Sequence, residues 1–233
     1  MLAPLLLLLL VSASEPPLVQ LDAAPEARTI SIPATDGAIT ADVYGAGERA
    51  VVLAHGGRFD RTSWKEQARV FAAAGFRVVA IDFRAAIASR QGKETPCLYD
   101  ASCLAKDILA VVRYLRRDGA KLVSVVGGSL GGGAAAQATV EAKTGEIDRV
   151  VLLAHMLIDE PARMKGRKLF IVARNDLGGS GKPRLDGIRA QFERAPDPKE
   201  MVILEGSAHA QFLFDSDQAK PLLDEILRFL SEP

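Results

Sequence analysis

Histidine and cysteine, the side chains that most often bind zinc in proteins, are scarce in this sequence, with three and two copies in 233 residues. Five residues separate Cys97 from Cys103, which is the wrong spacing for a redox Cys-x-x-Cys motif. With no histidine nearby, two thiols make a poor zinc site. Charge of one sign is not in excess either, since Lys plus Arg and Asp plus Glu number 29 each. The composition therefore gives no reason to expect a metal centre or binding to nucleic acid.

An apolar run long enough to span a bilayer is also missing. The N-terminal run, residues 2–11, is almost all leucine, but a membrane-spanning helix needs about 20 apolar residues. Small residues follow it, so we predict a secretory signal peptide over residues 1–13, cleaved after Ala13. No Lys or Arg precedes the run, which leaves a membrane anchor as the alternative, and no cysteine follows it, so a lipid anchor is not expected. We expect a secreted or periplasmic protein in which a proline-containing linker, residues 14–27, leads into one domain over residues 28–233.

The two cysteines also bear on whether the protein is exported. In an exported protein, Cys97 and Cys103 are a candidate disulfide that closes a short loop. The alternative is a pair of free thiols in a cytosolic protein. The N-terminal segment favours the disulfide, because it indicates an oxidising compartment.

Short apolar runs alternate with segments of helical periodicity along the rest of the chain. A length of 233 residues and a hydrophobic content of 48% suit one domain with a sizeable core. We expect strands over residues 29–33, 39–44, 50–54, 77–81, 122–126, 149–154, 168–173 and 201–204, and helices over residues 63–74, 103–117, 132–143, 184–194 and 220–230. The first two strands alternate apolar and polar residues, as in a half-exposed hairpin. The pattern predicts an α/β fold, with a mostly parallel central sheet of about eight strands and helices on both faces.

The pentapeptide Gly127-Gly128-Ser129-Leu130-Gly131 lies between an apolar run and an alanine-rich helical segment. Strand, Gly-x-Ser-x-Gly and helix in this order are typical of a nucleophile elbow, a sharp and strained turn that lifts a serine hydroxyl away from the sheet. The residues two before and two after the serine come very close together, so side chains there would clash. This explains Gly127 and Gly131 and predicts that Ser129 is a nucleophile.

A serine hydroxyl becomes an effective nucleophile only when a base accepts its proton. The usual chain order is serine, acid, histidine, and only His155 and His209 follow Ser129. Because His155 leaves no room for an acid placed after a later strand, we predict that His209, just past the last strand, is the base. The alternative for His209 is a structural role in its loop.

A carboxylate must orient the base and stabilise its protonated form. Asp176 directly follows an expected strand and precedes a glycine-rich loop, although an aspartate there could also only shape a turn. Asp159, past the preceding strand, is the rival acid. We favour Asp176 for its placement within the sheet. The candidate residues all follow strands, and ligands of parallel sheets bind at the carboxyl ends of the strands.

Acyl transfer also needs two N–H groups aimed at the oxyanion that develops in the transition state. We predict the amide of Leu130, at the positive end of a helix, and the amide of Gly57, in the turn after an early strand, with Arg58 as the next choice. His55 in the same turn is expected to pin the loop. Arg58 and Arg61 could attract an acidic substrate, although solvated arginines are commoner.

Together, these candidate residues make the chain resemble the α/β-hydrolase superfamily over residues 50–230. The resemblance is carried by His55-Gly56-Gly57, Trp64, Asp82-Phe83-Arg84, residues 127–131, Asp176 and His209. It implies that Ser129, Asp176 and His209 are the nucleophile, acid and base, that Gly57 and Leu130 form the oxyanion hole, and that Asp82 is a structural aspartate. Such a mechanism needs no metal and no cofactor.

Two segments distinguish this chain within the superfamily. Many members have glycines after the Asp-x-Arg triplet, where this chain has Ala85 and Ile87, so we expect the loop there to differ in shape. Larger members insert a cap domain where only residues 155–167 separate two strands here. The site should therefore be open or roofed by short loops, among them residues 85–102. The chain looks most similar to compact, cap-less members such as dienelactone-hydrolase-like enzymes and small carboxylesterases.

The expected function is hydrolysis of a carboxylic ester or a related acyl compound of small size, with no nucleic-acid partner and no stable membrane anchor. The same residues would serve a thioesterase, an amidase or peptidase, or an acyltransferase, because the triad does not distinguish leaving groups. A binding protein on a hydrolase scaffold is the non-enzymatic alternative, and the complete triad argues against it. Met156, Leu157 and Phe212 are candidates to line the pocket, but they are equally ordinary core residues.

Overall fold

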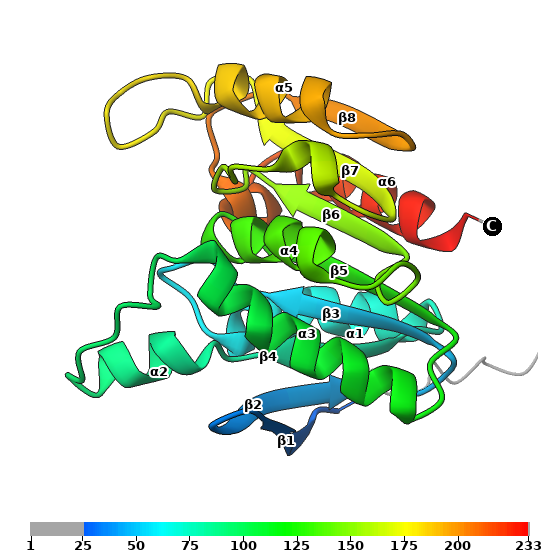
Figure 1. Ribbon diagram of the computed structural model, residues 1–233. Coiled ribbons are helices and arrows are strands. Elements are labelled where there is room, and N and C mark those ends of the chain that lie inside the picture. Colours follow the sequence, from blue (N-terminus) through cyan, green and yellow to red (C-terminus); the bar gives the residue numbers. More distant parts are fainter. Residues whose placement is uncertain (1–25, 233) are drawn as a thin grey trace, which may run out of the picture.

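An eight-stranded sheet forms the centre of the computed structural model, which describes residues 26–232 (Figure 1). The strands are β1 (Arg28–Ala34), β2 (Gly37–Tyr44), β3 (Arg49–Ala54), β4 (Arg77–Ile81), β5 (Leu122–Gly128), β6 (Arg149–Leu153), β7 (Arg167–Ala173) and β8 (Lys199–Leu204). Their order in the sheet is β1-β2-β4-β3-β5-β6-β7-β8. The pairs β1–β2 and β2–β4 are antiparallel and all the others are parallel. The predicted mostly parallel sheet is confirmed.

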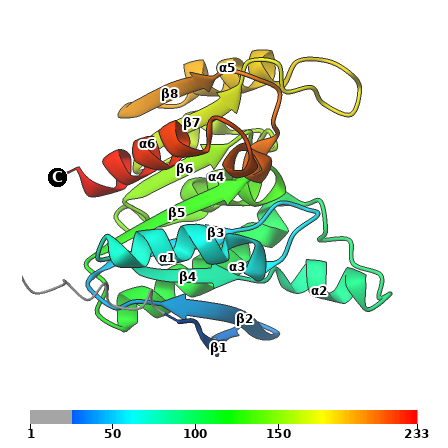
Figure 2. The ribbon, with the colours of Figure 1, turned by 180° about the vertical axis from the view of Figure 1, so that it is seen from behind.

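Helices cover both faces of this sheet. They are α1 (Lys65–Ala73), α2 (Arg84–Arg90), α3 (Ala101–Arg117), α4 (Leu130–Glu141), α5 (Arg184–Arg194) and α6 (Ala219–Ser231), with short 3-10 helices η1 (Arg61–Trp64), η2 (Pro161–Arg163) and η3 (Ala210–Asp215). Helices α3, α4 and α5 lie on one face, and α1 and α6 lie on the other (Figures 1 and 2). Because both faces are covered, the central strands are continuous apolar runs, such as the fully buried Val51-Val52-Leu53 of β3.

Local sequence explains several helix boundaries. The carboxylate of Asp100 accepts hydrogen bonds from the backbone N–H groups of Ser102 (2.9 Å) and Cys103 (3.3 Å), which caps the first turn of α3. Gly75 and Gly119 follow α1 and α3 with φ of +84° and +86°, a conformation that costs glycine little and that ends a helix.

Three elements differ from the sequence-based expectation. The single helix expected over residues 63–74 is divided into η1 and α1. Helix α4 begins at Leu130, two residues earlier than expected, because the elbow leads directly into it. Helix α2 was not predicted, and it occupies the segment in which Ala85 and Ile87 replace the glycines of many superfamily members. Alanine favours a helix where glycine favours a loop, so the helical conformation of this segment has a local cause.

The connection between β6 and β7 contains only the short η2, so the expected lack of a cap domain is confirmed. Cys97 and Cys103 are joined as a disulfide, with 5.3 Å between their Cα atoms, as predicted for the loop before α3. The predicted signal peptide (residues 1–13) and residues 14–25 of the predicted linker lie outside the described residues. Within the described range, no helix has both the length and the apolarity that crossing a bilayer requires.

Candidate active site

Ser129 occupies the turn between β5 and α4. Its φ of 52° and ψ of −112° are a strained conformation for a residue with a side chain. A Cβ atom on Gly127 would lie 2.4 Å from the carbonyl oxygen of Gly131, and a Cβ on Gly131 would lie 2.3 Å from that of Ala54. Both contacts are with backbone, which cannot give way cheaply. The steric reason expected for the two glycines is therefore present in the structure.

Three side chains from three strand ends meet at this turn. The Nε2 atom of His209 lies 2.8 Å from the Oγ atom of Ser129, and its Nδ1 atom lies 2.7 Å from Oδ2 of Asp176. An ionised carboxylate only accepts hydrogen bonds, so Nδ1–H of His209 donates to Asp176, and Nε2 is left to accept the proton of the Ser129 hydroxyl. The residues predicted as nucleophile, base and acid are thus brought into one hydrogen-bonded chain.

The acid is buried and has a second neighbour. Asp176 is 1% exposed, and its other oxygen, Oδ1, lies 3.4 Å from Nε of Arg184 at the start of α5. The backbone N–H of Arg184 also donates to the Asp176 carbonyl at 2.9 Å. A cation beside a buried carboxylate offsets part of its desolvation cost. Arg184 was not identified from the sequence. The rival acid, Asp159, is an exposed residue in the loop after β6.

The two residues whose amides are predicted to form the oxyanion hole lie at the same cleft. Gly57 and Leu130 both line it. Leu130 is the first residue of α4, so its N–H has no acceptor within the helix. Gly57 lies inside the turn that the Phe59 N–H closes on the Gly56 carbonyl at 3.0 Å. Neither amide donates to another group in the part of the chain that the structure describes.

Gln211 holds the loop that contains Gly57. Its Oε1 accepts the N–H of Gly56 at 2.7 Å, and its Nε2 donates to the hydroxyl of Ser63 at 2.9 Å. The side chain is buried, so these contacts fix the loop relative to η3. Gln211 was not identified from the sequence. Its position two residues after the predicted base, His209, could have indicated that it lies near the site.

His55 supports the same loop from the other side. Its Nδ1 lies 2.8 Å from the carbonyl oxygen of Gly56, and its Nε2 accepts the N–H of Phe83 at 3.3 Å. Burial lowers the pKa of His55 below its ordinary value, so the ring that makes these contacts is neutral. The structural role expected for His55 is confirmed.

Arg61 does not face the substrate, which corrects one expectation. Its guanidinium lies 3.0 Å from Asp42 and 2.5 Å from Asp82, and its backbone N–H donates to Asp82 at 2.9 Å. Both carboxylates are buried, so Arg61, whose side chain is 25% exposed, neutralises their charge and is not free for an acidic ligand. Asp82 is the structural aspartate that the resemblance implied. Arg58, by contrast, is exposed and lines the cleft.

The cleft beside Ser129 has a volume of about 570 Å³. Its lining is mostly apolar, with a small number of polar groups: Gly56, Gly57, Arg58, Phe59, Tyr99, Ser129, Leu130, Met156, Leu177, Arg184, His209, Ala210 and Phe212. Met156 and Phe212 thus line the cleft as proposed, whereas Leu157 lines an adjoining hollow of about 390 Å³. Tyr99 comes from the disulfide loop, so the segment expected to roof the site does reach it.

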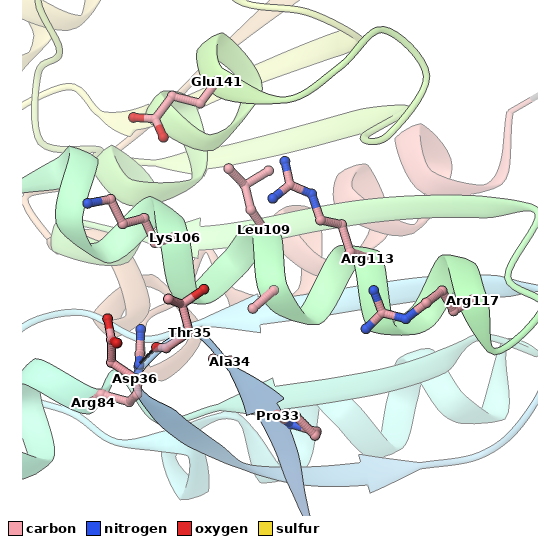
Figure 3. Close-up of a pocket in the computed structure, with 11 residues that line it drawn as sticks. Pro33, Ala34, Thr35, Asp36, Arg84, Lys106, Leu109, Arg113, Arg117 and Glu141 are labelled. Atoms are coloured by element: carbon pink, nitrogen blue, oxygen red, sulfur yellow. Dashed lines mark hydrogen bonds between the residues drawn. The ribbon is translucent and has the colours of Figure 1, made fainter.

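A further hollow, of about 610 Å³, lies between the end of the β1–β2 hairpin and α3 (Figure 3). Arg84 crosses it to the Thr35 carbonyl at 2.6 Å and pairs with Asp107, so its guanidinium serves to fasten the hairpin. None of the three hydrogen-bonded site residues lines this hollow. Among residues 26–232, no three His, Cys, Asp or Glu side chains gather closely enough to hold a metal ion.

Comparison with known proteins points to one family. The family model described as "Alpha/beta hydrolase family" matches residues 51–229. A dienelactone hydrolase from Anabaena variabilis superposes with a TM-score of 0.71 at 22% identity, over 89% of this chain and 95% of that one. An esterase from Pyrococcus furiosus gives 0.70 at 18% identity, over 88% and 92%. A thermophilic carboxylesterase cloned from a metagenomic library gives 0.67 at 19%, over 89% and 90%. At such identities these likenesses establish a shared fold. No curated protein matches the sequence.

Proposed function

The chain belongs to the alpha/beta hydrolase family, and from this premise we propose that it is a serine hydrolase that cleaves a carboxylic ester or related acyl compound. The observation that carries the proposal is the hydrogen-bonded chain from Ser129 through His209 to Asp176. This chain opens onto a cleft lined by Gly57 and Leu130, whose amides donate to no other group among residues 26–232. Nucleophile, base and orienting acid in mutual contact are the arrangement that acyl transfer requires.

The first half of the reaction follows from this geometry. As the Ser129 Oγ bonds to the substrate carbonyl carbon, Nε2 of His209 takes the hydroxyl proton. The carbonyl oxygen becomes an oxyanion, which the N–H groups of Gly57 and Leu130 stabilise. When the tetrahedral intermediate collapses, the bond to the leaving alcohol breaks and His209 returns its proton to that oxygen. The products of this half are the alcohol and an acyl-enzyme on Ser129.

Water completes the cycle with the same groups. His209 accepts a proton from the attacking water, whose oxygen bonds to the acyl carbon. Collapse of the second intermediate breaks the bond to Ser129 and returns the proton to its Oγ, so the free acid leaves and the enzyme is regenerated. Asp176 stabilises the imidazolium form of His209 in both halves and stays ionised throughout.

Covalent labelling tests this proposal. A fluorophosphonate should add to Ser129 of the full chain, with the adduct located by intact mass and peptide mapping. Ser129→Ala should remove the label and lower turnover of a reactive ester by about four to six orders of magnitude while leaving the circular dichroism spectrum unchanged. Ser31→Ala, on the exposed side of β1, is the matched control and should keep both. Wild-type turnover in Ser129→Ala would overturn the assignment.

A second experiment, with a panel of substrates, separates the related reactions. A panel of aryl esters, thioesters and aminoacyl amides, supplied with water or an alcohol as acceptor, distinguishes an esterase from a thioesterase, an amidase and an acyltransferase. An unlabelled serine together with tight, non-covalent ester binding would indicate a binding protein instead.

We also propose that the mature protein is exported and begins at Ser14. The disulfide between Cys97 and Cys103 supports this, because such bonds persist in oxidising compartments. Intact mass of the protein recovered outside the cytoplasm tests the cleavage site. Recovery of only the uncleaved chain from the cytoplasm would contradict the proposal.

A further inference from the structure

Large exposed apolar side chains gather at the opening of the active-site cleft. Tyr99 is 75% exposed, Leu177 57% and Phe212 41%, and all three line the cleft. Only six large apolar side chains are exposed within residues 26–232, so half of them lie at this one opening. Exposed apolar groups that cluster in this way mark a surface that a ligand covers.

The strand order divides the cleft into two sides. Phe59 follows β3, and Tyr99 lies in the α2–α3 connection that follows β4. Met156 follows β6, and Leu177 follows β7. Because β5 lies between β3 and β6, the nucleophile at its end separates the two sets. In Figure 1, α2 and the long loop after β7 project from the same edge of the sheet, on opposite sides of β5.

The two sides differ in chemistry. The ring of Phe212 lies 5.2 Å from that of Phe59, centroid to centroid, so Phe212 belongs with Phe59 and Tyr99. We name these three residues the aromatic flank. The other side presents the unbranched Met156 and the branched Leu177, with no ring. Two chemically different sides around one nucleophile match an ester, in which two different groups extend from the reacting carbonyl.

Backbone contacts hold the two loops that carry Tyr99 and Phe59 before a ligand arrives. Tyr99 lies within the loop that the Cys97–Cys103 disulfide closes, and the N–H of the next residue, Asp100, donates to the Cys97 carbonyl at 3.2 Å. On the neighbouring loop, the Arg90 side chain of α2 donates to the Phe59 carbonyl. Ligand affinity benefits from such preorganisation, because less conformational entropy is lost on binding.

We propose that the aromatic flank binds an aromatic ring of the substrate and that Tyr99 is a specificity-determining residue for aryl-bearing esters. The assignment of the substrate as an ester rests on the proposed function, whereas the preference for an aromatic ring rests on the flank alone. Paired aromatic rings gain from edge and offset contacts beyond the area they bury. A saturated ring of similar size buries similar area but lacks these contacts, so it should bind less well.

Two pairs of esters isolate this effect. Benzyl acetate and cyclohexylmethyl acetate place the ring in the alcohol, and methyl phenylacetate and methyl cyclohexylacetate place it in the acyl group. Within each pair the phenyl group withdraws electrons and makes its ester somewhat more reactive, so each kcat/KM ratio is divided by the ratio of the two hydroxide-catalysed hydrolysis rates. The corrected ratio reports recognition of the ring. We expect the aryl member of one pair to be preferred about tenfold by the wild-type enzyme.

Variants of Tyr99 decide whether the flank is responsible. Tyr99→Leu should reduce the aryl preference about threefold, with Phe59 and Phe212 accounting for the rest, and Tyr99→Phe, which keeps the ring, should retain it. The same ratios are measured as Kd values by NMR titration in the Ser129→Ala background, where no ester is consumed. A wild-type ratio near one in both pairs, or an unchanged ratio in Tyr99→Leu, would overturn the inference. If the wild type hydrolyses no ester and Ser129 does not react with the fluorophosphonate, the proposed function is wrong. The ratio of Kd values for the aryl and cyclohexyl esters still tests the aromatic flank in that case.

Discussion

Asp176 and His209 lie 33 residues apart in the chain, and their side chains meet at 2.7 Å beyond the ends of the neighbouring strands β7 and β8. The carboxylate accepts the Nδ1 proton of the imidazole, which leaves Nε2 directed at Ser129. Register between the two strands, rather than local sequence, sets this contact. The pairing of β7 with β8 therefore fixes the histidine tautomer that the proposed mechanism requires.

Replacement of Asp176 by asparagine tests this role. The amide of Asp176→Asn can donate a hydrogen bond to Nδ1, which favours the tautomer that carries its proton on Nε2. We expect kcat to fall by about four orders of magnitude with little change in the fold. The control is Asp159→Asn, in the exposed rival acid, which should keep kcat within about twofold. Equal losses in the two variants would contradict the assignment of the acid.

Close backbone packing around the elbow makes Gly131 difficult to replace. A Cβ atom there would lie 2.3 Å from the Ala54 carbonyl oxygen and 2.5 Å from that of His55. We expect Gly131→Ala to lower the free energy of unfolding by about 3 kcal/mol, measured by urea denaturation. Gly179→Ala is the control, because nothing lies within 4 Å of the Cβ position, and it should change stability by less than about 0.5 kcal/mol.

Removal of Arg61 should destabilise the fold rather than weaken substrate binding. Arg61→Met leaves the buried Asp42 and Asp82 without their shared cation, and we expect a loss of about 3 kcal/mol in the free energy of unfolding. Arg58→Met, three residues earlier and exposed, should cost less than about 0.5 kcal/mol. Urea denaturation of both variants at neutral pH measures the difference. A stable Arg61→Met with a raised KM would show that Arg61 serves the substrate after all.

The third histidine predicts a pH dependence of stability. His155 is buried against Phe170, and neither ring nitrogen has a hydrogen-bond partner within the described chain. The polar atoms of the nearby Gln191 are bound to the backbone of Ile158. Burial lowers the pKa of His155 from 6.5 to about 4. Between these two values the unfolded chain binds a proton that the folded chain does not, so stability falls as the pH falls.

A variant without this imidazole should be less sensitive to acid. Between pH 7.5 and 4.5 the titration of His155 accounts for roughly 2–3 kcal/mol of lost stability. His155→Phe keeps a ring against Phe170. Its free energy of unfolding, measured by urea denaturation at pH 7.5 and 4.5, should therefore fall by roughly 2–3 kcal/mol less than that of the wild type. Some acid sensitivity should remain, because burial also lowers the pKa of His55. An unchanged pH dependence in His155→Phe would disprove this account.

Several tertiary contacts had no counterpart in the sequence analysis. Arg61 resembled a solvated or ligand-binding cation, because its neighbours in the chain do not indicate that Asp42 and Asp82 surround it. The contact of Gln211 with Gly56 joins residues 155 positions apart. Arg184 was placed correctly at the start of a helix, yet its proximity to Asp176 depends on how the intervening loop folds. Such contacts depend on which strands are neighbours and on the path of the loops.

Short-range information in the chain was sufficient for the strands, for most helices and for the elbow with its two glycines. These features follow from side-chain periodicity and from steric limits that act within a few residues. The choice of Asp176 and His209 used in addition the chain order of serine, acid and histidine that is usual in such hydrolases. Only the folded chain decided that Arg61 pairs with two buried carboxylates, that Tyr99 is the residue of the roofing segment that lines the cleft, and that aromatic and aliphatic sides flank Ser129. The reason is physical: burial and ion pairing are properties of a three-dimensional environment, and residues distant in the sequence create that environment.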